Sequence, residues 1–223
     1  MVSSASHEGM HDSHTQATFQ AFVDAVIPPT LRYAQAGVIQ IPGALNLCIH
    51  DYVIWDLDHS QYIPPTGNPD ITPLSKSTAI LLDLGAEQFI RTSHAVQPQD
   101  GCPFPGGRLF STLSRSDRLL TVMLLDRLDI SLQSLPLPYQ NNPALIQVMM
   151  SSINQLTLFG YYSEWFGYGS TRLFTPDFRR LECYPPSWGL VGYPGPSFGY
   201  REFRGFILRY PHNKGAGECS TMM

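Results

Sequence analysis

Apolar residues recur at helical spacing as far as residue 162 of this 223-residue chain, and the period then disappears. A spacing of three and four residues places side chains on one face of a helix, whereas a strand would show strict alternation. Five segments carry the helical pattern, and none alternates convincingly. The sequence therefore predicts an all-α fold, an irregular bundle of about five helices that forms a domain over residues 16–162.

Capping residues and prolines set the expected ends of these helices. The expected ranges are 15–27, about 37 or 42 to 55, 73–94, 114–130 and 144–162, with a loop at 62–69. Residues 1–15 are polar and are expected to form a flexible tail. His7, His11 and His14 could share a helix face and bind a metal there, but no apolar stripe supports that helix, so a solvated tail is the simpler interpretation.

Residues 163–223 combine many aromatic side chains with many prolines and glycines. Disordered segments are poor in aromatic residues, because large apolar side chains supply the burial that offsets the entropy of ordering. We expect this segment to be a long, ordered, extended C-terminal arm that packs on the helical domain or on a partner.

Charged residues make up only 14% of the chain, against about 25% in an average soluble protein. Part of the surface is therefore expected to be covered by another molecule. The net charge of −4 and the presence of only two lysines make nucleic acid a poor candidate for the partner. No apolar run is long enough for a transmembrane helix, and the first fifteen residues do not resemble an export signal, so a cytoplasmic location is expected. The alternative is the periplasm or cell envelope, reached by export together with a partner.

The densest group of candidate catalytic or metal-binding residues is HDYVIWDLDH, with His50, Asp51, Asp56, Asp58 and His59. On a helix only subsets of these side chains share a face. Helix capping and surface charge are therefore the simpler interpretation, and a small metal-dependent enzyme that uses His50, Asp56 and His59 is an alternative. Motifs for a nucleophile elbow, a zinc peptidase and a dinucleotide site are absent. We expect no catalytic, cofactor or metal site in this chain.

The charges of the segment 114–130 are interpreted as a solvated face or as local ion pairs. The residues concerned are Arg115, Asp117, Arg118, Asp126, Arg127 and Asp129.

The four cysteines, at positions 48, 102, 183 and 219, fit no metal or redox spacing. They are expected to be buried thiols, or to include one disulfide that ties down the tail, with Cys183 and Cys219 as its possible members. A thiol bonded to a partner chain is a further alternative.

Three segments together resemble the small subunit, subunit 3 or gamma, of gluconate 2-dehydrogenase and related flavoprotein dehydrogenases. They are FQAFVDAVIPPT (19–30), similar to the family's opening helix, FGYYSEW (159–165), similar to the end of its last helix, and GLVGYPGPSFGY (189–200), similar to its closing Gly-Tyr-x-Gly motif. The resemblance spans most of the chain in the same order.

The resemblance implies a non-catalytic accessory subunit that binds a large FAD-containing subunit of the glucose-methanol-choline type, acting on sugars or sugar acids. It would help that subunit to fold, mature or stay assembled, and the FAD would reside in the partner. Large apolar interfaces favour Trp and Tyr as energetic anchors, so the expected interface residues are Trp165, Tyr168, Trp188, Tyr193 and Tyr200. The same aromatic residues could instead hold the arm on its own bundle. The alternative function is a self-assembling structural or envelope protein, a homo-oligomer whose aromatic arm docks onto a neighbouring copy.

Overall fold

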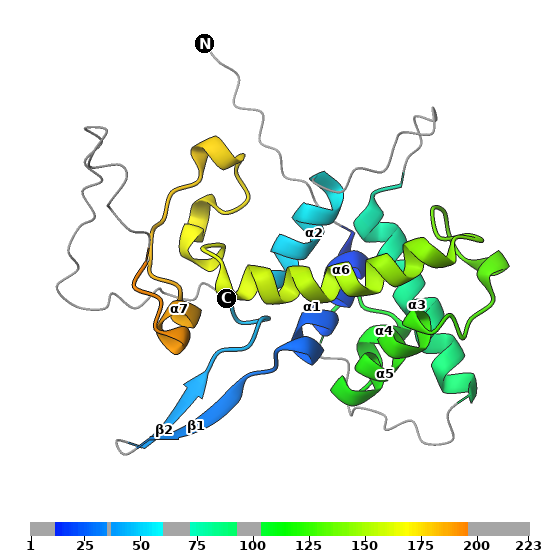
Figure 1. Cartoon of the computed structure of the whole chain (residues 1–223), viewed down its shortest axis with the longest axis horizontal. Helices are drawn as coiled ribbons and strands as arrows, with labels where there is room; N and C mark the ends of the chain where they lie inside the picture. The colour runs from blue at the N-terminus through cyan, green and yellow to red at the C-terminus, as the bar shows by residue number, and fades with distance from the viewer. Residues whose placement is uncertain (1–11, 35–36, 60–71, 93–103, 196–223) are drawn as a thin grey trace, which may run out of the picture. The chain divides into compact units, whose positions relative to one another are not determined.

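The computed structural model describes residues 12–34, 37–59, 72–92 and 104–195 (Figure 1). These residues are mostly helical, as predicted, and they include one two-stranded sheet. The chain divides into two compact units, Met1–Leu158 and Phe159–Met223. The predicted loop 62–69, Tyr200, Cys219 and the arm beyond residue 195 lie outside the described residues.

Helix α1, Ser13–Val26, matches the first predicted helix closely. The side chain of Asp12 caps its first turn by accepting a hydrogen bond from the backbone N–H of His14. Two prolines follow the helix at positions 28 and 29 and prevent its continuation. The prediction of a flexible tail as far as residue 15 is wrong for its last three residues, because Ser13 to Thr15 are helical and His14 is buried.

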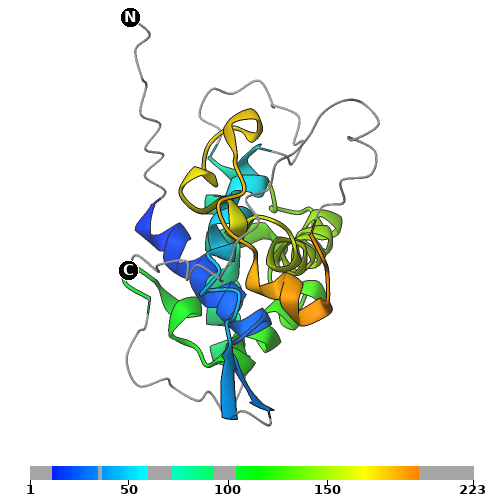
Figure 2. The same ribbon diagram turned by 90° about the vertical axis from the view of Figure 1, so that its left-hand side faces the viewer.

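An antiparallel hairpin follows α1, formed by strands β1, Thr30–Ala34, and β2, Gly37–Ile41. The prediction of a helix that starts near residue 37 is therefore wrong, because residues 37–41 form a strand. Val38, Ile39 and Ile41 are β-branched residues that favour strands, and Gly37 adopts a φ of 127°, which other residues rarely adopt. The hairpin projects away from the helices of the first unit (Figures 1 and 2).

The chain then returns to α1 through a close backbone contact. The amide of Ala44 donates to the carbonyl of Ile27 over 2.9 Å. A Cβ atom on Gly43 would lie 2.6 Å from that same carbonyl oxygen, so the approach requires glycine. After a series of turns, α2 spans Ile49–His59, later than the predicted start and four residues beyond the predicted end.

Helices α3, Leu74–Thr92, α5, Arg115–Asp126, and α6, Pro143–Tyr162, correspond to the remaining predicted helices. Ser114 caps α5 as predicted, because its hydroxyl accepts from the amide of Asp117. The start of α3 depends on Asp58 of α2, which accepts from both the amide and the hydroxyl of Ser75 at 2.9 and 2.8 Å. A short helix, α4, Leu109–Thr112, is an additional element that the sequence pattern did not predict.

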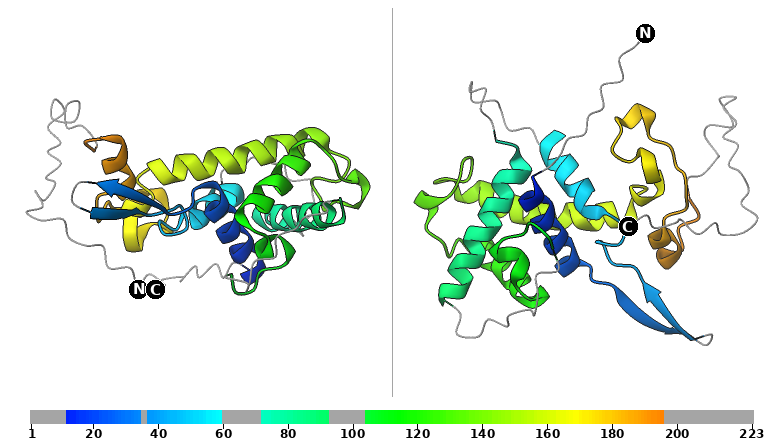
Figure 3. Two further views of the ribbon diagram at one scale, coloured as in Figure 1. Left: turned by 90° about the horizontal axis from the view of Figure 1, so that it is seen from below. Right: turned by 180° about the vertical axis from the view of Figure 1, so that it is seen from behind.

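The core of the first unit is centred on α1, which packs against α2, α3, α4 and α5 (Figure 3). Its fully buried residues include Phe19 and Phe22. Helices α3 and α5 approach closely, since a Cβ on Gly85 would meet Leu125 at 2.8 Å. The buried hydroxyl of Tyr139 lies 2.6 Å from that of Thr78 on α3.

The second unit is built from short helical turns after α6. Two 3-10 helices, η2, Phe166–Thr171, and η3, Pro176–Phe178, precede helix α7, Pro186–Val191. The indole N–H of Trp188 donates to the carbonyl of Tyr162, and the ring makes edge contacts with Tyr184 and Tyr193. Trp188 therefore packs residues 162, 184 and 193 together, and the predicted ordered, extended arm over residues 163–223 stays a prediction.

Candidate functional site

The predicted histidine and aspartate cluster of α2 does not gather into one site. His50 lies 3.3 Å from Asp51, Asp58 caps α3, and His59 donates to the carbonyl of Trp55 and stacks on its ring. In the ranges that the structure describes, no group of three His, Cys, Asp or Glu side chains is arranged to hold a metal ion. Of these residues, Asp58 serves to cap the start of α3.

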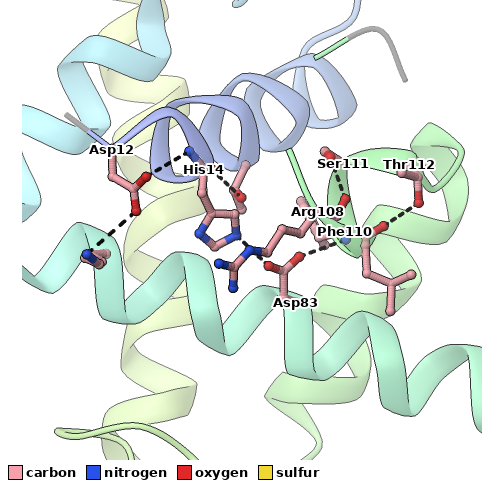
Figure 4. Close-up of polar contacts among 10 residues, drawn as sticks. Asp12, His14, Asp83, Arg108, Phe110, Ser111 and Thr112 are labelled. Carbon is pink, nitrogen blue, oxygen red and sulfur yellow. Dashed lines mark hydrogen bonds and ion pairs between the residues drawn. The ribbon is translucent and has the colours of Figure 1, made fainter. Parts of the chain in front are cut away.

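A second polar cluster joins α1, α3 and α4, and the sequence did not predict it (Figure 4). The Nε2 atom of His14 lies 2.5 Å from Oδ2 of Asp83, and both side chains are largely buried. The other oxygen of Asp83 accepts from the backbone N–H of Phe110 at 2.9 Å. The hydroxyl of Ser111 donates to the carbonyl of Arg108, so it is not directed at the histidine as a nucleophile would be. This cluster fixes the start of α1 against α3 and α4.

A third cluster corrects the prediction of solvated or locally paired charges for Arg115 and Arg118, whereas Asp126, Arg127 and Asp129 are exposed as predicted. Arg115 makes two hydrogen bonds to Asp24 of α1, at 2.9 and 2.8 Å, and Arg118 makes a third at 3.3 Å. Arg118 is fully buried, and it also donates to the carbonyls of Ala21 and Ser111. The hydrogen bond to Asp24 raises the pKa of Arg115 above its usual value. Since the partners are 91 and 94 residues apart in the sequence, local spacing could not predict them.

The same helix presents apolar side chains to the outside. Leu119, Leu120 and Met123 are exposed to 40, 46 and 46%. Its buried face, in contrast, includes Asp117, Arg118 and Thr121. A helix at the surface of a globular protein normally has the reverse arrangement, with its apolar stripe facing the core. This outward face of α5, defined by Leu119, Leu120 and Met123, is the first candidate interaction surface.

The predicted interface residues of the C-terminal segment fall into different environments. Trp165 and Trp188 are 2 and 4% exposed, so they belong to the interior of the chain. Tyr168 is half-buried, and its hydroxyl donates to Glu164. Burial together with this hydrogen bond raises its pKa to about 12. Tyr193, at 42% exposure, is available at the surface.

Arg179 packs against the rings of Trp165, which is buried, and Tyr168, which is half-buried. Its guanidinium carbon lies 5.1 Å from the ring centre of Trp165 and 5.9 Å from that of Tyr168. Among the described residues of the second unit, the exposed aromatic residues are not the predicted ones, apart from Tyr193. They are Phe159, Tyr162, Phe174, Phe178, Tyr184 and Tyr193, and we call them the exposed aromatic set.

Cys183 is half-buried, and its sulfur lies 4.0 Å from the carbonyl oxygen of Phe166. Its proposed pairing with Cys219 stays a prediction. Among the described residues, no helix combines the length and the apolar composition that a membrane span requires. The chain matches no protein-family model, no curated protein and no solved structure.

Proposed function

We propose that this chain is a non-catalytic accessory subunit that binds, and stabilises or matures, an FAD-dependent dehydrogenase of the glucose-methanol-choline type. The sugar or sugar-acid chemistry and the FAD belong to the large subunit. The identity of the partner class rests on the resemblance of residues 19–30, 159–165 and 189–200 to the small subunits of such enzymes.

The outward face of α5 is the observation that carries the binding role. Exposed Leu and Met side chains that lie within one helical turn form a compact apolar surface. The polar inner face of the helix is held by Asp24, so α5 cannot rotate to bury its leucines without breaking three hydrogen bonds of charged groups. In the ranges that the structure describes these side chains stay exposed, and a partner surface would remove them from water.

The small number of charges supports a permanent rather than a transient contact. Obligate interfaces are larger and more apolar than the rest of a protein surface, and charged residues are depleted from their centres. With 14% charged residues, the chain has few side chains that would oppose such burial.

The test is co-purification of the tagged chain from its native source, followed by mass spectrometry and an absorbance spectrum for bound flavin. We expect a yellow flavoprotein in about equal amount. The variant in which Leu120→Glu and Met123→Glu are combined should lose this partner, because two carboxylates would be desolvated in the interface. Gln155→Glu, at an exposed polar position of α6 and therefore outside the outward face of α5, is the matched control.

Circular dichroism should show equal helix content in both variants, which separates a lost contact from a lost fold. Recovery of the chain without any flavoprotein would contradict the proposal, as would a double variant that retains its partner.

Self-assembly through the C-terminal segment is a second candidate function, which the exposed aromatic set favours. Its large exposed rings, including Phe159 and Phe178 at 65 and 68% exposure, could dock onto a neighbouring copy. Recovery of the chain only with itself, as a colourless oligomer, would favour this candidate over the accessory subunit.

A further inference from the structure

The hairpin β1–β2 exposes three large apolar side chains. Leu31, Val38 and Ile39 are 63, 57 and 53% exposed. The pairing of Leu31 with Gln40 and of Arg32 with Ile39 places Leu31 and Val38 on one face and Ile39 on the other. Both faces of the hairpin therefore carry exposed apolar side chains. A two-stranded sheet is only marginally stable in water, and further strands are normally required.

The register of the hairpin determines which backbone groups point outward. Only two residues separate Ala34 from Gly37, so this pair and every second pair beyond it exchange hydrogen bonds across the hairpin. These hydrogen-bonded pairs are Ala34–Gly37, Arg32–Ile39 and Thr30–Ile41. The N–H and C=O groups of Val38 and Gln40 consequently point away from β1, and those of Leu31 point away from β2. Since no third strand pairs with either one among the described residues, each strand presents an edge that can accept another strand.

The two edges differ in charge. Strand β1 carries Arg32 at its centre, and a second copy paired antiparallel along this edge about Arg32 would place two guanidinium groups opposite each other. Strand β2, with the sequence GVIQI, has no charged residue, no proline and no lysine to discourage pairing.

Strand β2 is also complementary to itself. When two copies are related by a two-fold axis through Ile39, the outward groups of Val38 in one copy face those of Gln40 in the other. Two hydrogen-bonded pairs form, and Ile39 lies opposite Ile39 of the second copy in the closely spaced position between them. One isologous contact satisfies the outward backbone groups of both strands, as closed two-fold symmetry requires.

We infer that the edge of β2 is a homodimerisation surface, on which a second copy of this chain adds its own β2 to give a four-stranded antiparallel sheet. The contact covers Ile39 and Val38 of both copies and pairs the outward backbone groups of β2. It is separate from the outward face of α5, so a dimer remains free to bind the proposed flavoprotein through that face.

The test compares two proline substitutions by sedimentation equilibrium of the full-length chain over a range of concentrations. Gln40→Pro removes an N–H that points outward from β2 and leaves the hydrogen bonds within the hairpin in place. Leu31→Pro removes the equivalent outward N–H on β1 and is the matched control. We expect a dimer for the wild type and for Leu31→Pro, and a dissociation constant raised about tenfold or more in Gln40→Pro, since two hydrogen bonds are lost per dimer.

A cysteine cross-link gives a second, positive readout. Ile39→Cys places two thiols across the two-fold axis at a separation that suits a disulfide. After mild oxidation, peptide mapping should find a cross-link between the two copies of residue 39, whereas Leu31→Cys should give none between the two copies of residue 31. A wild type that stays monomeric, a Gln40→Pro dimer of unchanged strength, or a dimer without the cross-link at residue 39 would each overturn the inference. Loss of the flavoprotein from the purified complex would not affect it, so the two proposals fail separately.

Discussion

Replacing Asp24 by alanine should destabilise the first unit strongly. The change removes the acceptor of three hydrogen bonds, two from Arg115 and one from Arg118. Arg118 is the member that determines the cost, because its side chain is 1% exposed and cannot turn to water. The carbonyls of Ala21 and Ser111, to which it also donates, carry no compensating charge.

The expected loss of unfolding free energy depends on how deeply each of the two arginines is buried. Breaking a buried ion pair by removing one partner costs about 3–5 kcal/mol of unfolding free energy, because a buried charge is left uncompensated. Arg115 is 49% exposed, so its ion pair with Asp24 contributes only about 0–1 kcal/mol to the free energy of unfolding. We therefore expect Asp24→Ala to cost about 3–5 kcal/mol and Arg115→Ala about 1 kcal/mol or less.

Urea unfolding, followed by far-ultraviolet circular dichroism, measures both costs on the same chain. Asp126→Ala, at an exposed position near the end of α5, is the control for the loss of a carboxylate and should change the stability by about 0.5 kcal/mol or less. Domains of this kind are stable by about 5–15 kcal/mol, so the alanine variant should still fold. Equal costs for Asp24→Ala and Arg115→Ala would refute the reasoning, since Arg118 would then not depend on Asp24.

Three further predictions concern other parts of the chain. Gly43→Ala should be strongly destabilising in thermal unfolding, because its methyl group would overlap backbone atoms that cannot move aside. Tyr139→Phe should cost about 0.5–1.5 kcal/mol in urea unfolding at neutral pH through loss of the bond to Thr78. Burial raises the pKa of Tyr139, so the folded chain holds the phenol protonated and should lose stability as the pH rises above the ordinary value of about 10, and the phenylalanine variant should lose less. Finally, hydrogen bonds from the hydroxyl and amide of Ser170 lower the pKa of Glu182; a carboxyl titration by NMR should show this, and Ser170→Ala should shift the pKa of Glu182 upward.

Those helices that have local signals at their ends could be predicted from the sequence. The prolines at 28 and 29 define the end of α1, and Ser114 with Asp117 three residues later defines the start of α5. The cap at Asp12 was missed, because the polar residues before Thr15 were assigned to the tail. These signals act within one turn of helix, so they can be recognised without knowledge of the rest of the fold.

The hairpin could not be recognised in the same way. Its connecting residues are Gln35 and Ala36, and they lack the Asn-Gly or Asp-Gly pair that marks most two-residue hairpins. The apolar residues that follow were assigned to a helix because a short apolar run fits either period. These residues form strands because β1 pairs with β2, and this pairing is visible only in the structure.

The polar clusters were missed because their members are distant in the sequence. His14 meets Asp83 across 69 residues, and Asp24 meets Arg118 across 94. Sequence spacing assigned Arg118 to the solvated face of its helix, and only the packing of α5 against α1 turns it inward. Predictions of surface charge from one helix alone fail wherever another helix supplies the counter-ion.

The buried charges and the exposed leucines of α5 are two consequences of one orientation. Because Asp24 accepts from arginines at two positions on successive turns, it fixes the rotation of α5 as well as its distance from α1. Turning the helix to bury Leu119 and Leu120 would bring Arg118 out of the interior and leave Asp24 without its partners. The helix therefore presents its apolar side chains in a fixed arrangement. Little conformational entropy would be lost from this surface when a partner covers it. This arrangement requires a buried charge on Arg118, which is tolerated in the fold only while Asp24 is present to pair with it.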